Sequence, residues 1–257
     1  RAGHAGSAGV RLIGVGMGPG DPELVTVKGV RVLESADLVV VPVMDAHEQG
    51  RAEATVRAHV THDRLLRLVF ALDDRGGATE QRRSAWDAAA DAVAERLRET
   101  GGTVAFATIG DPNVYSTFSY LADAVRERLP EVAAETVPGI TAMQDLAARS
   151  GTVLCEGTES LALLPLTAGV AVFEEALAHF DTVVAYKGGR HMPAVLEVLR
   201  AHGRVDDAVF GAALGLPDEQ VRPAAEVEGA APYLSTVVVP ARRRGRGSRL
   251  TDTRGSA

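Results

Sequence analysis

The sequence predicts an α/β fold of two domains, and three observations lead to this prediction. Short apolar runs rich in Val, Ile and Leu alternate along the chain with longer stretches of 3.6-residue periodicity. Such alternation is typical of parallel or mixed sheets whose two faces are covered by helices. After Leu129-Pro130 the elements become shorter, and the last two strand-like runs are joined by a loop without a long helix. The length of 257 residues is sufficient for two modest domains.

The apolar runs are expected to form buried parallel strands, because β-branched and apolar residues are nearly continuous in them. These runs cover residues 11–15, 37–43, 65–70, 102–108, 135–137, 161–164, 182–186, 207–212 and 233–239.

Between the strands, apolar residues recur at helical spacing. The clearest case is residues 79–100, where Trp86, Ala90, Val93 and Leu97 share one face and Gly101-Gly102 gives the expected stop. Further helices are expected over residues 26–35, 117–128, 141–150, 173–179 and 192–202, and in the stretch after Gly50. We therefore expect an N-terminal α/β domain over residues 10–130, a C-terminal α/β domain over 131–240, and a cleft between them.

The ends of the chain differ in composition from its body. Residues 1–9 lack the apolar core of a signal peptide and are expected to form a disordered leader. Residues 241–257 are rich in Arg, Gly and Ser and are expected to form a disordered basic tail. Removing the tail's net charge of +5 from the total of −7 leaves −12 for residues 1–240. A body this acidic argues against nucleic acid as the main partner.

The bulk composition favours a cytoplasmic enzyme. No apolar run approaches the roughly 18 residues that a membrane span needs, so no membrane partner is expected. A single cysteine, Cys155, excludes an internal disulfide framework and a cysteine-based zinc site. No bound metal is expected.

A glycine-rich stretch follows the first strand and reads GVGMGPGDP over residues 14–22. The dinucleotide-binding fingerprint G-x-G-x-x-G requires a third glycine where this chain has Pro19. Pro19 and Pro22 also lack the backbone N–H groups that a pyrophosphate needs. We therefore reject a nicotinamide dehydrogenase and expect Asp21 to cap a helix that begins at Pro22.

The same device recurs later in the N-terminal half. The strand at 102–108 is followed by GDPNVYST over residues 110–117 and then by a helix. A third turn, VPGIT over 137–141, leads into another helix. Because the carboxyl ends of parallel strands meet at one edge of a sheet, we expect the loops at 14–22 and 110–117 to lie together where α/β proteins bind ligands, and we take the turn at 137–141 as a third candidate. Asp111 is expected to cap its helix, to contact a ligand, or both.

These three motifs, in this order and spacing, resemble the tetrapyrrole (corrin and porphyrin) methylases. The resemblance runs from about residue 10 to residue 240. Within the family, the chain is most similar to the group that methylates C20 of precorrin-2 in cobalamin biosynthesis. The indicators are GDPNVYST at 110–117, RSAWDAA at 83–89, EGTESLALLP at 156–165 and YLS at 233–235. The chain departs from the family pattern at AMQD over 142–145, where smaller or serine-rich residues are expected.

The resemblance implies S-adenosylmethionine (SAM) as cofactor, bound in a folded shape in the cleft between two α/β domains and released as S-adenosylhomocysteine. It also implies a homodimer. Adenine and methionine would be held mainly by backbone groups, which suits loops rich in glycine and proline. The cofactor-binding residues implied are Pro19, Gly110, Asp111, Val114, Tyr115, Thr141, Ala142, Lys187, Ala212, Ala213, Ser235 and Thr236.

The implied reaction is methyl transfer to C20 of precorrin-2, which yields precorrin-3A. This carbon is enamine-like and nucleophilic, so we assign no catalytic base, and catalysis should come from alignment and water exclusion. The substrate carries many carboxylates, which arginines near the site would have to bind. The substrate-binding candidates are Ser116, Thr117, Arg51, Arg83 and Arg190.

Two alternatives remain open on the sequence. The first is another precorrin methyltransferase, or one that acts at C20 of the cobalt-containing counterpart, cobalt-factor II. The second is a protein that binds SAM or a tetrapyrrole without turnover.

Overall fold

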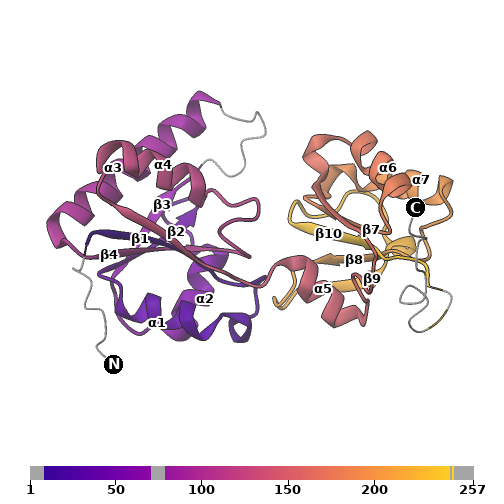
Figure 1. Cartoon of the computed structure of the whole chain (residues 1–257), viewed down its shortest axis with the longest axis horizontal. Helices are drawn as coiled ribbons and strands as arrows, with labels where there is room; N and C mark the ends of the chain where they lie inside the picture. The colour runs from indigo at the N-terminus through magenta and orange to yellow at the C-terminus, as the bar shows by residue number, and fades with distance from the viewer. Residues whose placement is uncertain (1–8, 71–78, 244, 246–257) are drawn as a thin grey trace, which may run out of the picture. The chain divides into compact units, whose positions relative to one another are not determined.

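The computed structural model describes residues 9–70, 79–243 and 245, and its chain divides into two compact units (Figure 1). Unit 1 is Arg1–Thr141 and unit 2 is Ala142–Ala257. Each unit contains one five-stranded sheet with helices packed on it, as the predicted α/β class requires. No helix in the described part of the chain is both long and apolar enough to span a membrane.

Unit 1 is built on a fully parallel sheet in the order β3-β2-β4-β1-β5. Its strands are β1 (Arg11–Gly16), β2 (Leu38–Val43), β3 (Leu65–Val69), β4 (Thr103–Thr108) and β5 (Ala133–Val137). Going from β1 to β2, the chain moves toward the β3 edge of the sheet. Going from β4 to β5, it moves in the opposite direction, toward the β5 edge. Since parallel crossovers are right-handed, the helices that follow β1 and β4 lie on opposite faces of the sheet.

In the described part of unit 1, α-helices cover both faces of this sheet (Figure 1). On one face lie α1 (Val27–Ser35) and α2 (Arg51–His59), and on the other α3 (Glu80–Thr100) and α4 (Phe118–Arg128). Alternate residues of β1 point to the two faces: Leu12 joins the core under α3 and α4, and Ile13 joins the core under α1 and α2. Helix α3 begins at its Thr79 cap and ends at Gly101 in the left-handed conformation, as predicted.

Unit 2 is built on a mixed sheet in the order β6-β7-β10-β8-β9. Its strands are β6 (Leu161–Pro165), β7 (Thr182–Tyr186), β8 (Val209–Ala212), β9 (Gln220–Pro223) and β10 (Ser235–Val239). The prediction that all runs form parallel strands was wrong here, because β10 pairs antiparallel with β7 and β8. Strand β9, which was not predicted, pairs antiparallel with β8. Without crossover helices, these last strands can only return as antiparallel neighbours.

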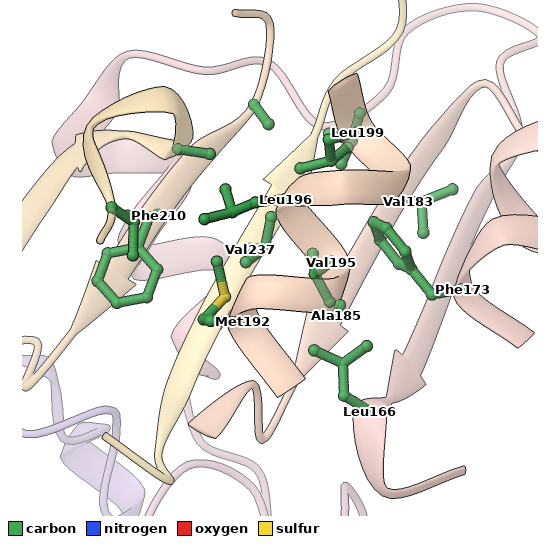
Figure 2. Close-up of a cluster of buried hydrophobic side chains, with 14 of the residues drawn as sticks. Leu166, Phe173, Val183, Ala185, Met192, Val195, Leu196, Leu199, Phe210 and Val237 are labelled. Carbon is green, nitrogen blue, oxygen red and sulfur yellow. The ribbon is translucent and has the colours of Figure 1, made fainter. Parts of the chain in front are cut away.

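The helices of unit 2 are α5 (Ala142–Ser150), α6 (Val170–His179) and α7 (Met192–Ala201). Figure 2 shows Met192, Val195 and Leu199 of α7 lying over the sheet, with Phe173 of α6 beside Val183. Helix α5 contributes Leu146 to a second cluster with Val184 and Val238. Short 3-10 turns complete the described part at Pro22–Leu24, Leu166–Ala168, Gly189–His191 and Ala224–Glu226.

The boundary between the two units lies later in the sequence than predicted. The boundary was placed at residue 130, but β5 pairs with β1 along Arg11 to Val15 and therefore belongs to unit 1. The predicted disorder of residues 241–257 is wrong for its first residues. Arg242 pairs with Asp207 at 2.6 Å, and Arg243 bonds the fully buried carboxylate of Glu159 at 2.5 Å. The rest of this tail except Gly245, and residues 1–8 of the predicted leader, lie outside the described residues.

Candidate functional site

Three loops of unit 1 come together at the carboxyl edge of its sheet. The sequence predicted this for the loops after β1 and β4, whereas it assigned the loop after β5 to the C-terminal domain. The loops after β1 and β4 are joined by an isolated antiparallel bridge between Gly18 and Gly110. In this bridge the Gly110 N–H donates to the Gly18 carbonyl at 2.7 Å. The loop after β5 reaches the same place through Gly139, whose N–H donates to Asp111 at 3.0 Å. All three sequence motifs therefore meet at one junction.

The junction has no room for side chains between its backbones. A Cβ on Gly139 would lie 2.1 Å from the Gly110 carbonyl oxygen and 2.8 Å from the Gly16 Cα. A Cβ on Gly16 would lie 2.5 Å from the Gly139 nitrogen. All three distances are below what real Cβ atoms show, and all three neighbours are backbone atoms, so these loops approach each other only through glycine.

Gly110 leaves space on its other side. Its φ is +71°, and a Cβ built on it would meet no described atom within 4 Å. A ligand can therefore approach this stretch of backbone without meeting a side chain, which is the property expected of a site that binds SAM through backbone groups. The residues present fit the implied cofactor at this point.

Asp111 fastens two of the loops to each other. One carboxylate oxygen accepts the Asn113 N–H at 2.7 Å, and the other accepts the Gly139 N–H at 3.0 Å. The prediction that Asp111 caps the following helix was wrong, because α4 begins at Phe118 and its N-cap residue is Thr117. The Asp–Pro pair instead forms a short side-chain turn. Cofactor contact by Asp111 stays a prediction.

The first Asp–Pro pair forms the same kind of turn. Asp21 accepts the Glu23 N–H at 2.9 Å and caps the 3-10 turn Pro22–Leu24. Asp21 therefore acts as the predicted cap with Pro22 in the first position, but the turn is short. Helix α1 starts separately at Val27, where Thr26 accepts the Gly29 N–H at 3.0 Å. The repeated motif is thus also repeated in local structure.

Tyr115 stands out in the loop after β4. Its φ is +51°, in the left-handed region that strains every residue except glycine, and its side chain is 45% exposed. Desolvation raises the pKa of its phenol above the ordinary value. Ser116 beside it is hydrogen-bonded to Thr108 at 2.9 Å and accepts the Phe118 N–H at 3.1 Å.

Unit 2 carries a second group of predicted residues at one edge of its sheet. Lys187 follows β7, Ala213 follows β8, and both have positive φ, of +60° and +51°. The first residue of β10, Ser235, is opposite Ala212, and Thr236 is opposite Tyr186. The antiparallel direction of β10 thus brings its start to the ends of β7 and β8.

The buried hydroxyl of Ser235 has a structural partner. Its Oγ accepts the Gly189 N–H at 3.2 Å, and a Cβ on Gly188 would lie 2.6 Å from it. Sequence reasoning missed Gly188 and Gly189, and also Tyr186, whose hydroxyl accepts the Met143 N–H at 2.9 Å in the first turn of α5. The glycine pair after a strand was the available signal for the first two, whereas the Tyr186 contact joins residues 43 positions apart.

The remaining predicted residues are distributed over both units. Pro19 and Thr141 are buried, Val114 and Ala142 are half-buried, and Thr117 makes no side-chain cap bond. Arg51 is the first residue of α2 and is exposed, and Arg83 pairs with Glu80 of its own helix at 3.3 Å. Arg190 in unit 2 is exposed beside His191. The structure does not gather these arginines within one unit. Among the described residues, no group of three His, Cys, Asp or Glu side chains is arranged to hold a metal.

The chain matches known proteins over most of its length. The family model for tetrapyrrole (corrin/porphyrin) methylases covers residues 11–228. A precorrin-2 C(20)-methyltransferase from Sinorhizobium is 36% identical, with 90% of this chain and 95% of that protein aligned. A cobalt-precorrin-2 C(20)-methyltransferase from Salmonella typhimurium is 30% identical, with 89% and 95% aligned.

A solved structure shares the fold. The uroporphyrin-III C-methyl transferase from Thermus thermophilus, complexed with S-adenyl homocysteine, aligns with a TM-score of 0.61 at 21% identity, over 90% of this chain and 92% of that one. The family match covers all three motifs of the glycine junction in unit 1 and the strand-end loops after β7 and β8 in unit 2. The chain therefore belongs to the tetrapyrrole (corrin/porphyrin) methylases.

Proposed function

We propose that this protein is a SAM-dependent methyltransferase that methylates C20 of precorrin-2, giving precorrin-3A in cobalamin biosynthesis. The observation that carries the proposal is the junction of Gly16, Gly110 and Gly139, where the three family motifs meet around an open stretch of backbone. The near full-length similarity to two proteins named as C20-methyltransferases supports the position of methylation. The S-adenyl homocysteine complex of the Thermus relative supports the cofactor.

SAM, when bound, supplies an electrophilic methyl group on a sulfonium. Transfer of this methyl to C20 would break the sulfur–methyl bond, leave S-adenosylhomocysteine and release the C20 proton. The loops of this chain contribute alignment: backbone groups near Gly110 orient the ligand, and Asp111 keeps the loops after β4 and β5 in register. The protonated Tyr115 phenol offers a neutral hydrogen bond beside them. Alignment and water exclusion contribute on the order of 7–11 kcal/mol at best.

The predicted residues of unit 2 belong to the same proposal. Lys187 and Ala213 hold left-handed backbone at the ends of β7 and β8, and such strain accumulates where backbone must present particular groups to a ligand. We propose that these loops, with Ala212, Ser235 and Thr236, also bind the cofactor. A homodimer, which the resemblance implies, is proposed as the assembly, and light scattering of the purified chain tests it.

The decisive experiment incubates the chain with SAM and, separately, with precorrin-2 and its cobalt-containing counterpart. Mass spectrometry then detects the added methyl, and NMR locates it. We expect one methyl at C20, with precorrin-2 preferred, because identity is higher to the relative named for the metal-free substrate. Methylation at C2, C7 or C17 overturns the C20 assignment, and SAM binding without any transfer favours a binding protein.

An Asp111→Ala variant is expected to bind SAM about tenfold more weakly. The change removes two hydrogen bonds that join backbone N–H groups of two loops, each worth about 1 kcal/mol or less in net terms. Isothermal titration calorimetry measures the loss. Asp123→Ala is the matched control, because Asp123 is a 73% exposed acid of α4 that pairs with Arg126 three residues later in the same helix. Equal affinity in both variants contradicts the role assigned to Asp111.

A further inference from the structure

A chain of three charged side chains joins α5 to the loop after β8 in unit 2. Arg149 donates through Nε to Asp145 Oδ1 at 2.9 Å, one turn earlier in α5. Its Nη1 reaches Glu219 at 2.8 Å. Glu219 in turn accepts the Gly215 N–H through Oε2 at 2.7 Å. The three side chains therefore connect a helix to one backbone amide of a loop.

The loop that receives this connection has an unusual conformation. It leaves β8 through Ala213, whose φ of +51° is unfavourable for alanine. Two tight turns follow, in which the Leu216 N–H donates to the Ala213 carbonyl and the Glu219 N–H to the Leu216 carbonyl, each at 3.0 Å. Surrounding contacts have to hold the Ala213 backbone in this conformation. The hydrogen bond to Glu219 acts on Gly215, which lies within the turn from Ala213 to Leu216.

Asp145 has one carboxylate oxygen that is buried without a hydrogen-bond donor among the described residues. The residue is 5% exposed, and this oxygen is its Oδ2. A buried carboxylate oxygen without a donor destabilises the fold. The neighbouring Leu146 lies directly against β8, since a Cβ on Gly211 would be 2.7 Å from it. Helix α5 is thus packed against β8, and the three charged side chains connect it to the loop that follows this strand. Asp145 therefore needs a role other than stabilising the fold.

We propose that Asp145, Arg149 and Glu219 form a positioning relay that holds the loop over residues 213–219 and thereby sets the affinity of the protein for SAM. Asp145 orients Arg149, Arg149 orients Glu219, and Glu219 fixes the Gly215 amide two residues after Ala213. The inference rests on the proposed function, because it treats the end of β8 as part of the cofactor site. None of the three side chains needs to contact the cofactor.

The test measures SAM binding by calorimetry and the hydrogen exchange of the Gly215 amide in five variants. Arg149→Met and Glu219→Gln are expected to raise the Kd about 3- to 10-fold and to speed Gly215 exchange. The effect of the two changes together should be less than the product of the single effects, because both break one connection. Asp145→Asn should raise the Kd similarly while unfolding at an equal or higher denaturant concentration than wild type. The matched control is Asp206→Asn, an exposed acid of unit 2 that precedes β8 and lies outside this loop.

The outcomes separate the inference from the proposed function. Variants that bind SAM like the wild type, or keep the wild-type exchange of Gly215, overturn the relay alone. Lower unfolding stability at an unchanged Kd likewise overturns it, since that is the signature of a merely structural network. A wild-type chain that does not bind SAM overturns the proposed function and the relay with it.

Discussion

Replacing Gly139 by alanine is expected to weaken SAM binding by at least about 100-fold in a protein that still folds. The new methyl would lie 2.1 Å from the Gly110 carbonyl oxygen, and this neighbour is backbone that no rotamer change can move aside. Relief requires the loops after β4 and β5 to separate by more than an ångström, which also breaks the 3.0 Å bond from the Gly139 N–H to Asp111. A displacement of about 1 Å in a positioning element is worth roughly 100-fold. Calorimetric titration with SAM and with S-adenosylhomocysteine measures the effect.

Gly102→Ala is the matched control for this prediction. Gly102 lies in the same unit just before β4, at the opposite edge of the sheet, and its Cβ would lie 2.1 Å from Asp37 Oδ2. Both variants should lose stability through overpacking, but only Gly139→Ala should lose affinity. Circular dichroism and the fluorescence of Trp86, the single tryptophan of the chain, confirm folding. If both variants bind SAM equally weakly, global destabilisation explains the loss and the junction has no special role.

The meeting of the glycine loops was predictable because it follows from topology. Once the runs at 11–15 and 102–108 are recognised as parallel strands, the turns that follow them must lie at the same edge. The Gly18–Gly110 bridge confirms this expectation at the level of single residues. The glycines and prolines of GVGMGPGDP indicated backbone that something approaches closely, and the distances at Gly16 and Gly139 show that other backbone does so.

Strand direction in the second half was not predictable in the same way. A run such as 233–239 is apolar whether its neighbours are parallel or antiparallel, so composition alone carries no direction. Strand β9, Gln-Val-Arg-Pro, is a polar edge strand without the buried pattern that identified the others. The boundary after Thr141 depends on the pairing of β5 with β1, which joins residues more than 120 positions apart.

Backbone strain offers a signal that the sequence does not contain. Among the described residues, the non-glycine residues with left-handed φ are Tyr115, Lys187 and Ala213. They follow β4, β7 and β8, and all three are residues that the family resemblance implies for the cofactor. Strained backbone persists only where surrounding contacts determine it and is concentrated at functional sites. The resemblance and the backbone geometry point to the same strand ends, and this agreement supports the proposal that these positions bind the ligand.

The stability of unit 1 depends on one buried ion cluster. The Glu53 side chain in α2 is fully buried and accepts from Arg67 Nε in β3 at 2.6 Å and from Arg57 Nε at 2.8 Å. Arg67 also donates to the Ala46 carbonyl at 3.1 Å, so the cluster joins a helix, a strand and the loop after β2. The hydrogen bond from Arg67, opposed by desolvation and aided by Arg57, holds the pKa of Glu53 below its ordinary value.

Glu53→Gln is therefore expected to lower the free energy of unfolding of unit 1 by about 2–3 kcal/mol at pH 7. This value is at the low end for breaking a buried ion pair, because both arginines keep some solvent contact. A lowered carboxyl pKa stabilises the fold above the unfolded pKa of about 4.3, and this stability is lost as the pH falls through the folded pKa. The difference between wild type and variant should thus shrink below about pH 4.3. Urea titrations followed by Trp86 fluorescence measure this difference in unfolding free energy.

Glu99→Gln, in the exposed Arg96–Glu99 pair, is the control and should change stability by less than about 0.5 kcal/mol at every pH. A constant difference for Glu53→Gln across this pH range would show that packing, and not the carboxylate charge, stabilises this position.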